Sequence, residues 1–340
     1  MTHSYLDDLL AQPEALQAAL ESLGRTAPLS KVHNQLKDGK FTRLILTGMG
    51  SSFHGLYPLL LRLFKASIPV NRLETAELIH YAPNLLDASN LIVAVSQSGE
   101  SAEIVQLLEL TRGRSTVIGV TNTPTSALAQ HADIVLLTKA GMEASVSCKT
   151  YISALAALVW LGDELTGDRT QFASLAELPH KIAEYWSCWQ DSVAQLSQIV
   201  QGMQHLFLLG RGNSLAAAST GALIIKEAAR VAAEGMNCAA FRHGPLELIS
   251  PTTFALVYLG ADHTSELNAK MAGDIRSAGG QAELVSMGAG LPPFHLPNCS
   301  PAALPILEIQ AVQLISLALA ELQGIEAGKF IHASKVTTEE

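Results

Sequence analysis

The chain has 340 residues, of which 48% are hydrophobic and only 16% are charged, so it can bury sizeable cores and is not a disordered chain. The formal net charge is −9, from 22 Lys and Arg against 31 Asp and Glu, and basic residues form no block, which argues against a nucleic-acid partner. Small aliphatic residues outnumber aromatic ones, which make up 5%, and this bias is typical of parallel α/β sheets.

Cysteine usage and the N-terminus indicate the compartment. The four cysteines include no Cys-x-x-Cys pair, so the sequence predicts neither a zinc site nor a disulfide framework. The N-terminus carries Asp7 and Asp8 instead of a basic start with an apolar core, and no stretch reaches the roughly 18 uncharged apolar residues of a membrane span. We therefore expect a soluble, cytoplasmic protein without a membrane partner.

The first half of the chain alternates between strands and helices. Residues 4–23 have helical spacing and predict one helix packed across the domains. Residues 43–52 form an apolar run that ends in a Gly-x-Gly-Ser-Ser turn before a helix-like stretch. Further strands, separated by helix-length segments, are expected at 90–95, 116–121 and 134–137. This alternation indicates a parallel sheet.

The same pattern recurs in the second half. Residues 206–214 repeat residues 43–52, with Gly50 matching Gly212 and Ser52 matching Ser214 at the same offset, which predicts a duplicated chain. Further strands are expected at 253–259 and 281–286, separated by an amphipathic helix at 266–278.

Two more helical regions complete the predicted α/β fold. Residues 167–200 predict a helical connector that begins at a boundary near 167–170, and residues 306–322 predict a long helix that Glu308 and Glu321 make unsuitable for a membrane. Its expected core-facing stripe consists of Leu307, Val312, Ile315, Leu319 and Leu322. The predicted segments are an N-terminal helix at 1–28, a first α/β domain at 29–168, a connector at 169–195, a second α/β domain at 196–325 and a tail at 326–340.

A serine-rich turn, Ser96-Gln97-Ser98-Gly99-Glu100-Ser101, follows the expected strand 90–95 and precedes an apolar helix. Free backbone N–H groups and the helix dipole favour an anion there, and the serine hydroxyls add donors for a phosphate. An ordinary capped turn has the same pattern. The turn at 48–52 is expected at the same edge of the sheet, which strengthens the phosphate hypothesis, whereas no complete nucleotide-binding motif is present.

Six motifs, taken in order, resemble the tandem SIS (sugar isomerase) domains of the glucosamine-6-phosphate synthase (glutamine-fructose-6-phosphate aminotransferase) family. They are Gly48-Met49-Gly50-Ser51-Ser52, the serine-rich turn, Ala140-Gly141-Met142-Glu143, Leu209-Gly210-Arg211-Gly212, Lys226-Glu227 and Arg242-His243-Gly244-Pro245. The likeness runs from about residue 40 to the C-terminus. It implies two SIS domains, each a doubly wound, mainly parallel, flavodoxin-like sheet flanked by helices.

The resemblance also implies roles for individual residues. Glu227 would move a proton between C1 and C2 of the sugar through an enediol or enolamine, which suits a carboxylate with a raised pKa. His243 would open the sugar ring from the neighbouring subunit, so a homodimer with a shared active site is implied. Without the family pattern, a solvated helix glutamate and a structural histidine would be expected. The implied sugar-phosphate ligands are Ser51, Ser52, Ser96, Gln97, Ser98 and Ser101, with Val146 and Ser147 near the sugar.

The sequence departs from the synthase pattern in four respects. Some 40 residues precede the first strand where the synthase has a glutaminase domain, and Ile224 stands at the position of its Schiff-base lysine. The loop 143–150 is one residue shorter, and Lys335 lies one position later, in a Ser-Lys-Val-Thr tail more like that of stand-alone deaminases and isomerases. We therefore predict an aldose–ketose isomerase or deaminase acting on an amino-sugar or hexose 6-phosphate without a cofactor. Lys335 is predicted as a third catalytic residue, in contact with the open-chain sugar.

Two alternatives stay open from the sequence. The same proton-transfer groups would serve a deglycase that cleaves a fructosamine phosphate. SIS domains also occur in non-catalytic regulators that sense sugar phosphates, although the N-terminal residues here supply no basic recognition helix. In the second repeat, Asp262 stands where anion donors would be wanted, so one phosphate site per chain is expected. The adjacent Asp262 and His263 lack further ligand spacing, and no metal site is predicted.

Overall fold

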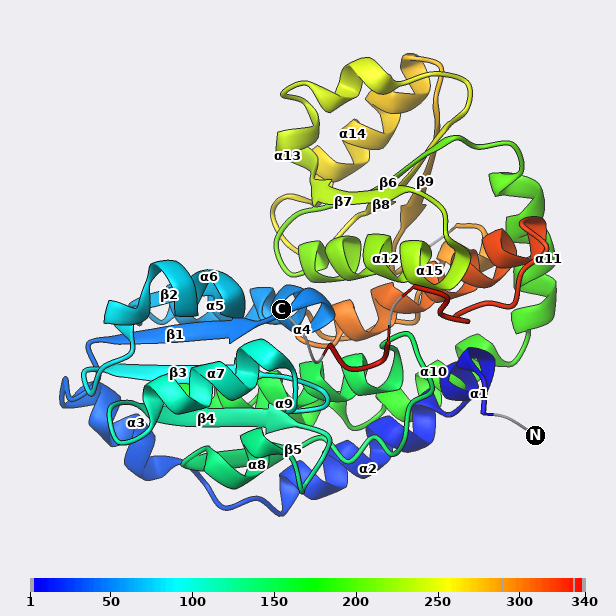
Figure 1. Ribbon diagram of the computed structural model, residues 1–340. Helices are drawn as coiled ribbons and strands as arrows, with labels where there is room; N and C mark the ends of the chain where they lie inside the picture. Colours follow the sequence, from blue (N-terminus) through cyan, green and yellow to red (C-terminus); the bar gives the residue numbers. More distant parts are fainter. Residues whose placement is uncertain (1–2, 289, 333, 338–340) are drawn as a thin grey trace. The chain divides into compact units, whose positions relative to one another are not determined.

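The computed structural model describes residues 3–288, 290–332 and 334–337. The chain forms two compact units. The first-sheet unit contains residues 14–143, 147–176 and 332–340, and the second-sheet unit contains residues 1–13, 144–146 and 177–331. Each unit is built on one parallel sheet flanked by helices, which confirms the predicted fold class (Figure 1). The five predicted segments do not coincide with these units and stay predictions.

The first sheet has the order β2-β1-β3-β4-β5, and all its strands are parallel. Its strands are β1 (Arg43–Gly48), β2 (Val70–Glu74), β3 (Asn90–Val95), β4 (Thr116–Thr121) and β5 (Ile134–Leu137). This is the flavodoxin-like order, in which the chain leaves β1 towards β2 on one side and later returns to β3 on the other. Ligands of such sheets bind at the carboxyl ends of the strands on either side of this reversal, here β1 and β3.

Helices cover both faces of the first sheet. On one face, α6 (Thr75–Tyr81), α7 (Ala102–Thr111) and α8 (Ala127–His131) bury a core that includes Ile45, Ile92 and Leu107. The other face carries α9 (Lys149–Thr166), which packs against α3 (Ser30–Lys37), α4 (Gly50–Gly55) and α5 (Tyr57–Lys65). Because helix packing on both faces excludes water, every residue of β3 is buried.

The second sheet repeats the order of the first four strands, as β7-β6-β8-β9. Its strands are β6 (His205–Gly210), β7 (Ala233–Asn237), β8 (Thr253–Tyr258) and β9 (Gln281–Val285). One face is covered by α13 (Cys238–Phe241) and α14 (Ser265–Ser277), which share a core with Phe207 and Val257. The other carries α12 (Ser214–Ala229), which packs on α15 (Leu304–Leu322), and α15 in turn packs on α10 (Leu178–Trp186) and α11 (Trp189–Val200).

The strands β2 and β7 fall outside the predicted set. Both lie at the edge of their sheet and are only partly buried. They carry polar residues such as Asn71, Arg72 and Glu234. Because edge strands need not be apolar on both faces, they lack the hydrophobic run that marks a buried parallel strand.

The expectation of one helix over residues 4–23 is wrong. The structure has α1 (Tyr5–Leu10), which begins with a capping box between Ser4 and Asp7, and a separate α2 (Gln12–Gly24). Pro13 lies in the first turn of α2, where its missing N–H is tolerated, whereas it would break the interior of a longer helix. The division between the two compact units also falls here, after Pro13.

The helix α15 is buried on all sides, whereas a single core-facing stripe is predicted. Every residue from Leu304 to Ala320 is buried, and Leu322, assigned to the stripe, is 42% exposed. Among the described residues, α15 is the one helix long and apolar enough to cross a membrane, but 89% of that stretch is buried inside the structure. Its apolar composition is therefore that of a core helix.

Candidate functional site

Two turns leave the first sheet side by side. The strands β1 and β3 end at Gly48 and Val95, which are register partners. A Cβ at position 48 would lie 2.9 Å from the carbonyl oxygen of Val95, so only glycine allows this close approach. The first turn places Ser51 and Ser52 at the start of α4, and the serine-rich turn leads into α7. Two helix N-termini therefore meet at the carboxyl edge of the sheet.

The serine-rich turn is held by its own hydroxyl groups. Ser96 Oγ accepts a hydrogen bond from Gly99 N at 3.1 Å, and Ser98 Oγ accepts one from Glu100 N at 3.2 Å. Each hydroxyl acts there as an acceptor and keeps its hydrogen for another acceptor. Ser101 is the N-cap of α7, and its side chain makes no capping hydrogen bond. The turn therefore retains three hydroxyl donors.

The one acidic side chain of this turn is engaged elsewhere. Glu100 Oε1 accepts a hydrogen bond of 2.7 Å from Ala127 N, the first residue of α8. A carboxylate is stabilised at a helix N-terminus by the free N–H groups and the helix dipole. This contact stabilises the negative charge of Glu100, which belongs to a turn that is otherwise rich in hydrogen-bond donors.

A small cavity of about 20 Å³ opens at this edge, which is enough for about one water-sized group. Of the predicted ligands, Ser51, Ser52, Gln97 and Ser147 line it. Ser96, Ser98 and Ser101 belong to the adjoining turn but are not among its lining residues, and Val146 is completely buried. No charged side chain lines the cavity, so an anion here would be bound by neutral donors and helix N-termini.

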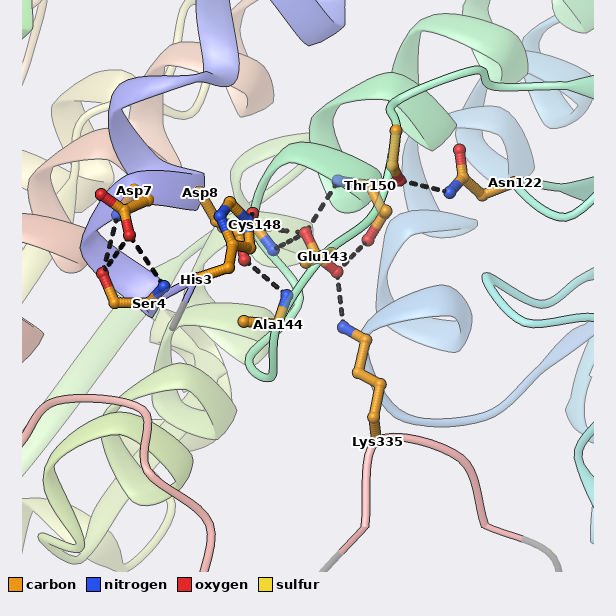
Figure 2. Close-up of polar contacts among 11 residues, drawn as sticks. His3, Ser4, Asp7, Asp8, Asn122, Glu143, Ala144, Cys148, Thr150 and Lys335 are labelled. Atoms are coloured by element: carbon orange, nitrogen blue, oxygen red, sulfur yellow. Dashed lines mark hydrogen bonds and ion pairs between the residues drawn. The ribbon is translucent and has the colours of Figure 1, made fainter. Parts of the chain in front are cut away.

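Residues of the next two strands also reach this edge, and the sequence analysis does not include them. Thr121 ends β4, and Asn122 and Thr138 follow β4 and β5; all three line the cavity. Asn122 Oδ1 accepts hydrogen bonds from Thr138 Oγ1 and Ala140 N at 3.0 and 2.8 Å. Its Nδ2 donates to Gly141 O at 2.8 Å (Figure 2). The rule that parallel strands place their carboxyl ends together is the signal that points to them.

We expect Gly99→Ala to weaken sugar-phosphate binding about tenfold or more, against less than about twofold for Gly39→Ala. The two glycines have similar φ angles, +67° and +72°, so both alanines meet comparable backbone strain. A Cβ at position 99 would lie 2.3 Å from Ser126 Oγ, whereas nothing lies within 4 Å at position 39. Only Gly99→Ala should displace the serine-rich turn. Titration calorimetry measures the difference. Equal affinities of the two variants would contradict the prediction that the serine-rich turn binds phosphate.

Glu143 organises the loop that precedes α9 (Figure 2). Its Oε1 accepts hydrogen bonds of 3.0 Å from the backbone N of both Cys148 and Thr150, and its Oε2 accepts one of 2.6 Å from Thr150 Oγ1. The side chain is completely buried. An anion at the N-terminus of an 18-residue helix is favoured by its dipole, so Glu143 fixes the loop that carries Ser147.

The tail places Lys335 on this carboxylate. Lys335 Nζ lies 2.5 Å from Glu143 Oε2, and the lysine side chain is 23% exposed. Two residues later, Thr337 O accepts a hydrogen bond of 3.2 Å from Ala102 N, at the start of α7. The described tail residues therefore contact both the loop before α9 and the helix that follows the serine-rich turn. The other tail residues, 333 and 338–340, lie outside the described residues.

We expect Glu143→Gln to lower the free energy of unfolding by about 2–4 kcal/mol, because an amide nitrogen cannot accept the hydrogen bonds of the carboxylate oxygen that it replaces, and the ion pair with Lys335 is lost. Glu109→Gln is the matched control, since Glu109 is exposed. Urea unfolding measures both variants. If Glu143→Gln lowered the free energy of unfolding as little as the control does, the Glu143 carboxylate would not hold the loop.

The second-sheet unit carries the two predicted proton-transfer residues. Glu227 lies in the last turn of α12 and is half-buried. His243 lies in the exposed segment between α13 and the short 3-10 helix Pro245–Leu248, where its backbone N donates to Ala240 O at 2.9 Å. Ile224, at the position of the synthase lysine, is completely buried.

The edge of the second sheet that corresponds to the serine-rich turn carries carboxyl groups. Ser214 Oγ, at the start of α12, donates a hydrogen bond of 2.6 Å to Glu308 Oε1. Glu308 is completely buried, and this burial raises its pKa to about 8, although the Ser214 hydrogen bond works in the opposite direction. A Cβ at Gly212 would lie 2.8 Å from Asp262 Oδ2. The Asp262 carboxylate, and the use of the Ser214 hydroxyl by Glu308, make this edge a poor phosphate site.

The described part of the chain contains no group of three His, Cys, Asp or Glu side chains arranged to hold a metal ion. Asp262, adjacent to His263, accepts hydrogen bonds of 2.7 Å from Thr264 N and Thr264 Oγ1 through its Oδ1. These contacts hold the turn that precedes α14 (Ser265–Ser277).

The sequence was compared with protein families and curated proteins. The SIS domain model matches residues 36–162 and 199–286, more than half of the chain. Over 341 residues the chain is 31% identical to the glutamine–fructose-6-phosphate aminotransferase of Pyrococcus horikoshii, covering 95% of this chain and 55% of that protein. The enzyme of the same name from Chlorobaculum tepidum is 27% identical, covering 99% and 58%. The chain thus spans little more than half the length of these relatives.

Solved structures share the fold at low identity. The C-terminal domain of glucosamine-fructose-6-phosphate aminotransferase from Francisella tularensis has a TM-score of 0.82 at 22% identity, covering 96% of this chain and 98% of that one. Glucosamine-6-phosphate deaminase from Thermotoga maritima has a TM-score of 0.81 at 18%, covering 98% and 99%. Tagatose-6-phosphate ketose/aldose isomerase from Escherichia coli has 0.78 at 19%, covering 97% of each. With the two family matches and the repeated strand order, the chain belongs to the SIS domain family and contains two SIS domains.

Proposed function

We propose that this chain interconverts an aldose or amino-aldose 6-phosphate with a ketose 6-phosphate, and that it releases ammonia when the substrate is an amino sugar. The observation that carries the proposal is the pairing of the Gly48 turn with the serine-rich turn, where hydroxyls and two helix N-termini converge without a lining charge. Such a site suits a phosphate. Relatives named for fructose 6-phosphate and glucosamine 6-phosphate support a hexose or amino-sugar skeleton.

In the proposed reaction, the turn hydroxyls bind the phosphate and His243 transfers the proton that opens the sugar ring. The Glu227 carboxylate then removes the proton from C2 of the open-chain amino sugar, which gives an enolamine. Return of that proton to C1 gives an imine at C2, which water hydrolyses to the ketose phosphate and ammonia. With a hexose phosphate, the same two transfers pass through an enediol and end in isomerisation.

Ile224 favours a mechanism in which the imine contains the nitrogen of the substrate, and not a lysine nitrogen of the enzyme. A Schiff base between enzyme and ketose needs a lysine amine, and the aliphatic side chain at this position is completely buried. Lys335 is a less suitable nucleophile, because its Nζ is held in an ion pair 2.5 Å from the buried Glu143 carboxylate. We propose that Lys335 contacts the open-chain sugar through hydrogen bonds only.

The exposure of His243 supports a shared active site. We propose a homodimer in which the histidine of one subunit serves the sugar bound to its partner, and a cytoplasmic location for that dimer. A catalytic histidine that lies exposed on its own chain needs burial by another surface to act in a water-excluded site.

The test is to incubate the purified chain with glucosamine 6-phosphate and to measure ammonia and fructose 6-phosphate in one coupled assay. We expect both products in equal amounts. A panel of hexose 6-phosphates and fructosamine phosphates is run in parallel. Isomerisation without ammonia would restrict the activity to hexose phosphates, and amine release from a fructosamine phosphate would identify a deglycase. Tight binding of sugar phosphates without turnover of any of them would overturn the enzymatic proposal in favour of a sensor.

A further inference from the structure

A second cavity lies at the amino edge of the first sheet, the edge opposite to the serine-rich turn. Its volume is about 440 Å³, and it is enclosed by the end of α7, the start of β4 and the end of α8. All its lining residues belong to the first-sheet unit. Leu108, Ala88 and Val117 supply apolar patches, and the other lining residues are polar, charged or glycine. No Phe, Tyr or Trp lines it.

The charges around this cavity are mainly positive. Lys40, Arg112, Arg114 and His131 line it, against one acidic residue, Asp133. Asp133 Oδ2 accepts a hydrogen bond of 2.8 Å from Val117 N. Within the described ranges, neither arginine nor Lys40 forms an ion pair with a carboxylate. Lys40 Nζ lies 5.2 Å from the centroid of the Phe41 ring, a cation–π contact. In a chain of net charge −9, three cations without a carboxylate partner around one hollow are a local reversal of the electrostatic field.

Helix capping explains part of this cluster only. Arg112 directly follows α7, and His131 is the last residue of α8, so both lie where a helix C-terminus attracts a positive charge. Each helix end carries only about half an elementary charge. Lys40 and Arg114 do not lie in the last turn of either helix. The positive charge therefore exceeds what the two helix ends neutralise.

The charge of Arg114 interacts with the carboxylate of Asp87. Hydrogen bonds from Ser89, and to a smaller extent the charge of Arg114, hold the pKa of Asp87 below its ordinary value. The Asp87 carboxylate is bound by Ser89 Oγ and N at 2.6 and 2.8 Å, and no ion pair joins it to Arg114. The guanidinium therefore keeps its donors for another acceptor.

A buried hydroxyl adds a second, independent feature. Ser115 lines the cavity, and its Oγ is buried without a hydrogen-bond partner among the described residues. A buried hydroxyl without a partner is unfavourable, and a ligand oxygen that reached this atom would restore its hydrogen bond. Ser115 stands between Arg114 and Thr116 in the chain, and both neighbours also line the cavity.

We propose that this cavity binds a small, multiply charged phosphate ester or polyphosphate, separate from the sugar-phosphate site. Two guanidinium groups match phosphate oxygens through paired hydrogen bonds, and the lack of an aromatic ring argues against a nucleotide base. The helix α7 has ten residues, so its two ends are about 15 Å apart. An anion in this cavity therefore binds without displacing one at the serine-rich turn.

The test uses inorganic pyrophosphate and the intact chain in titration calorimetry at physiological ionic strength. We expect one saturable site per chain, and a loss of affinity of about tenfold or more in the double variant Arg112→Gln, Arg114→Gln. The matched control is Arg25→Gln with Lys65→Gln, which removes two exposed cations away from the cavity and should change the affinity by less than about twofold. Saturating glucose 6-phosphate should leave pyrophosphate binding unchanged.

Three results would overturn the proposal: no saturable binding, an equal loss in the control variant, or competition by glucose 6-phosphate, which would place pyrophosphate at the serine-rich turn. Arg114→Gln alone, which leaves the residue after α7 intact, should still lose about threefold, so an unstable double variant does not prevent a decision. The measurement needs no turnover, so its outcome is independent of the proposed enzymatic activity.

Discussion

Glu227→Gln is expected to lower kcat by roughly 10²- to 10⁴-fold while leaving the affinity for the sugar phosphate within about twofold. The amide keeps the size of the side chain but cannot accept the proton from C2, and the phosphate is bound by residues of the first-sheet unit. Steady-state kinetics and calorimetry with the same sugar phosphate separate the two effects. Near-normal turnover in this variant would remove Glu227 from the mechanism.

The control variant is Glu234→Gln, because Glu234 is exposed and belongs to the same unit. It should keep full activity. The proposed dimer adds a sharper control. Mixed, inactive Glu227→Gln and His243→Ala chains should recover activity after subunit exchange, because a hybrid dimer contains one site with both native residues. Failure of exchanged hybrids to recover activity would contradict a shared active site.

As the pH rises from about 4.5 to about 8, the Glu308→Gln variant is expected to gain stability relative to the native chain. Burial raises the pKa of the folded carboxyl to about 8 from an ordinary value of 4.5, so between these pH values the folded state retains a proton that the unfolded state releases. The native protein therefore loses stability through this window, by up to roughly 5 kcal/mol. Glutamine does not titrate and should abolish that loss while its amide oxygen accepts the hydrogen bond from Ser214.

The measurement is the free energy of unfolding in urea at several pH values, taken as the difference between the variant and the native chain. The difference should be nearly constant below pH 4.5, change across the window and be constant again above pH 8. Glu234→Gln, which replaces an exposed carboxylate, should show almost no such change. A flat difference for Glu308→Gln would mean that Glu308 is ionised in the folded protein.

Features that depend on neighbouring residues can be predicted from the sequence alone. Buried parallel strands such as β3 are continuous apolar runs, and the turns after β1 and β3 need glycine and serine at fixed positions, so both are visible in the sequence. Because the two halves repeat one pattern, the duplication of the α/β unit also follows from the sequence. The roles of Glu227 and His243 rest on family resemblance, and they stay predictions.

Only the tertiary structure decided which distant residues meet. The edge strands β2 and β7 and the burial of α15 from Leu304 to Ala320 depend on what packs against them, and no local period encodes this. The pairs Glu143 with Lys335 and Ser214 with Glu308 join residues far apart in the chain. Burial, which is a property of the folded unit, is also what raises the pKa of Glu308. A carboxylate in the sequence shows its charge, but only packing decides whether it caps a helix, pairs with a lysine or retains a proton.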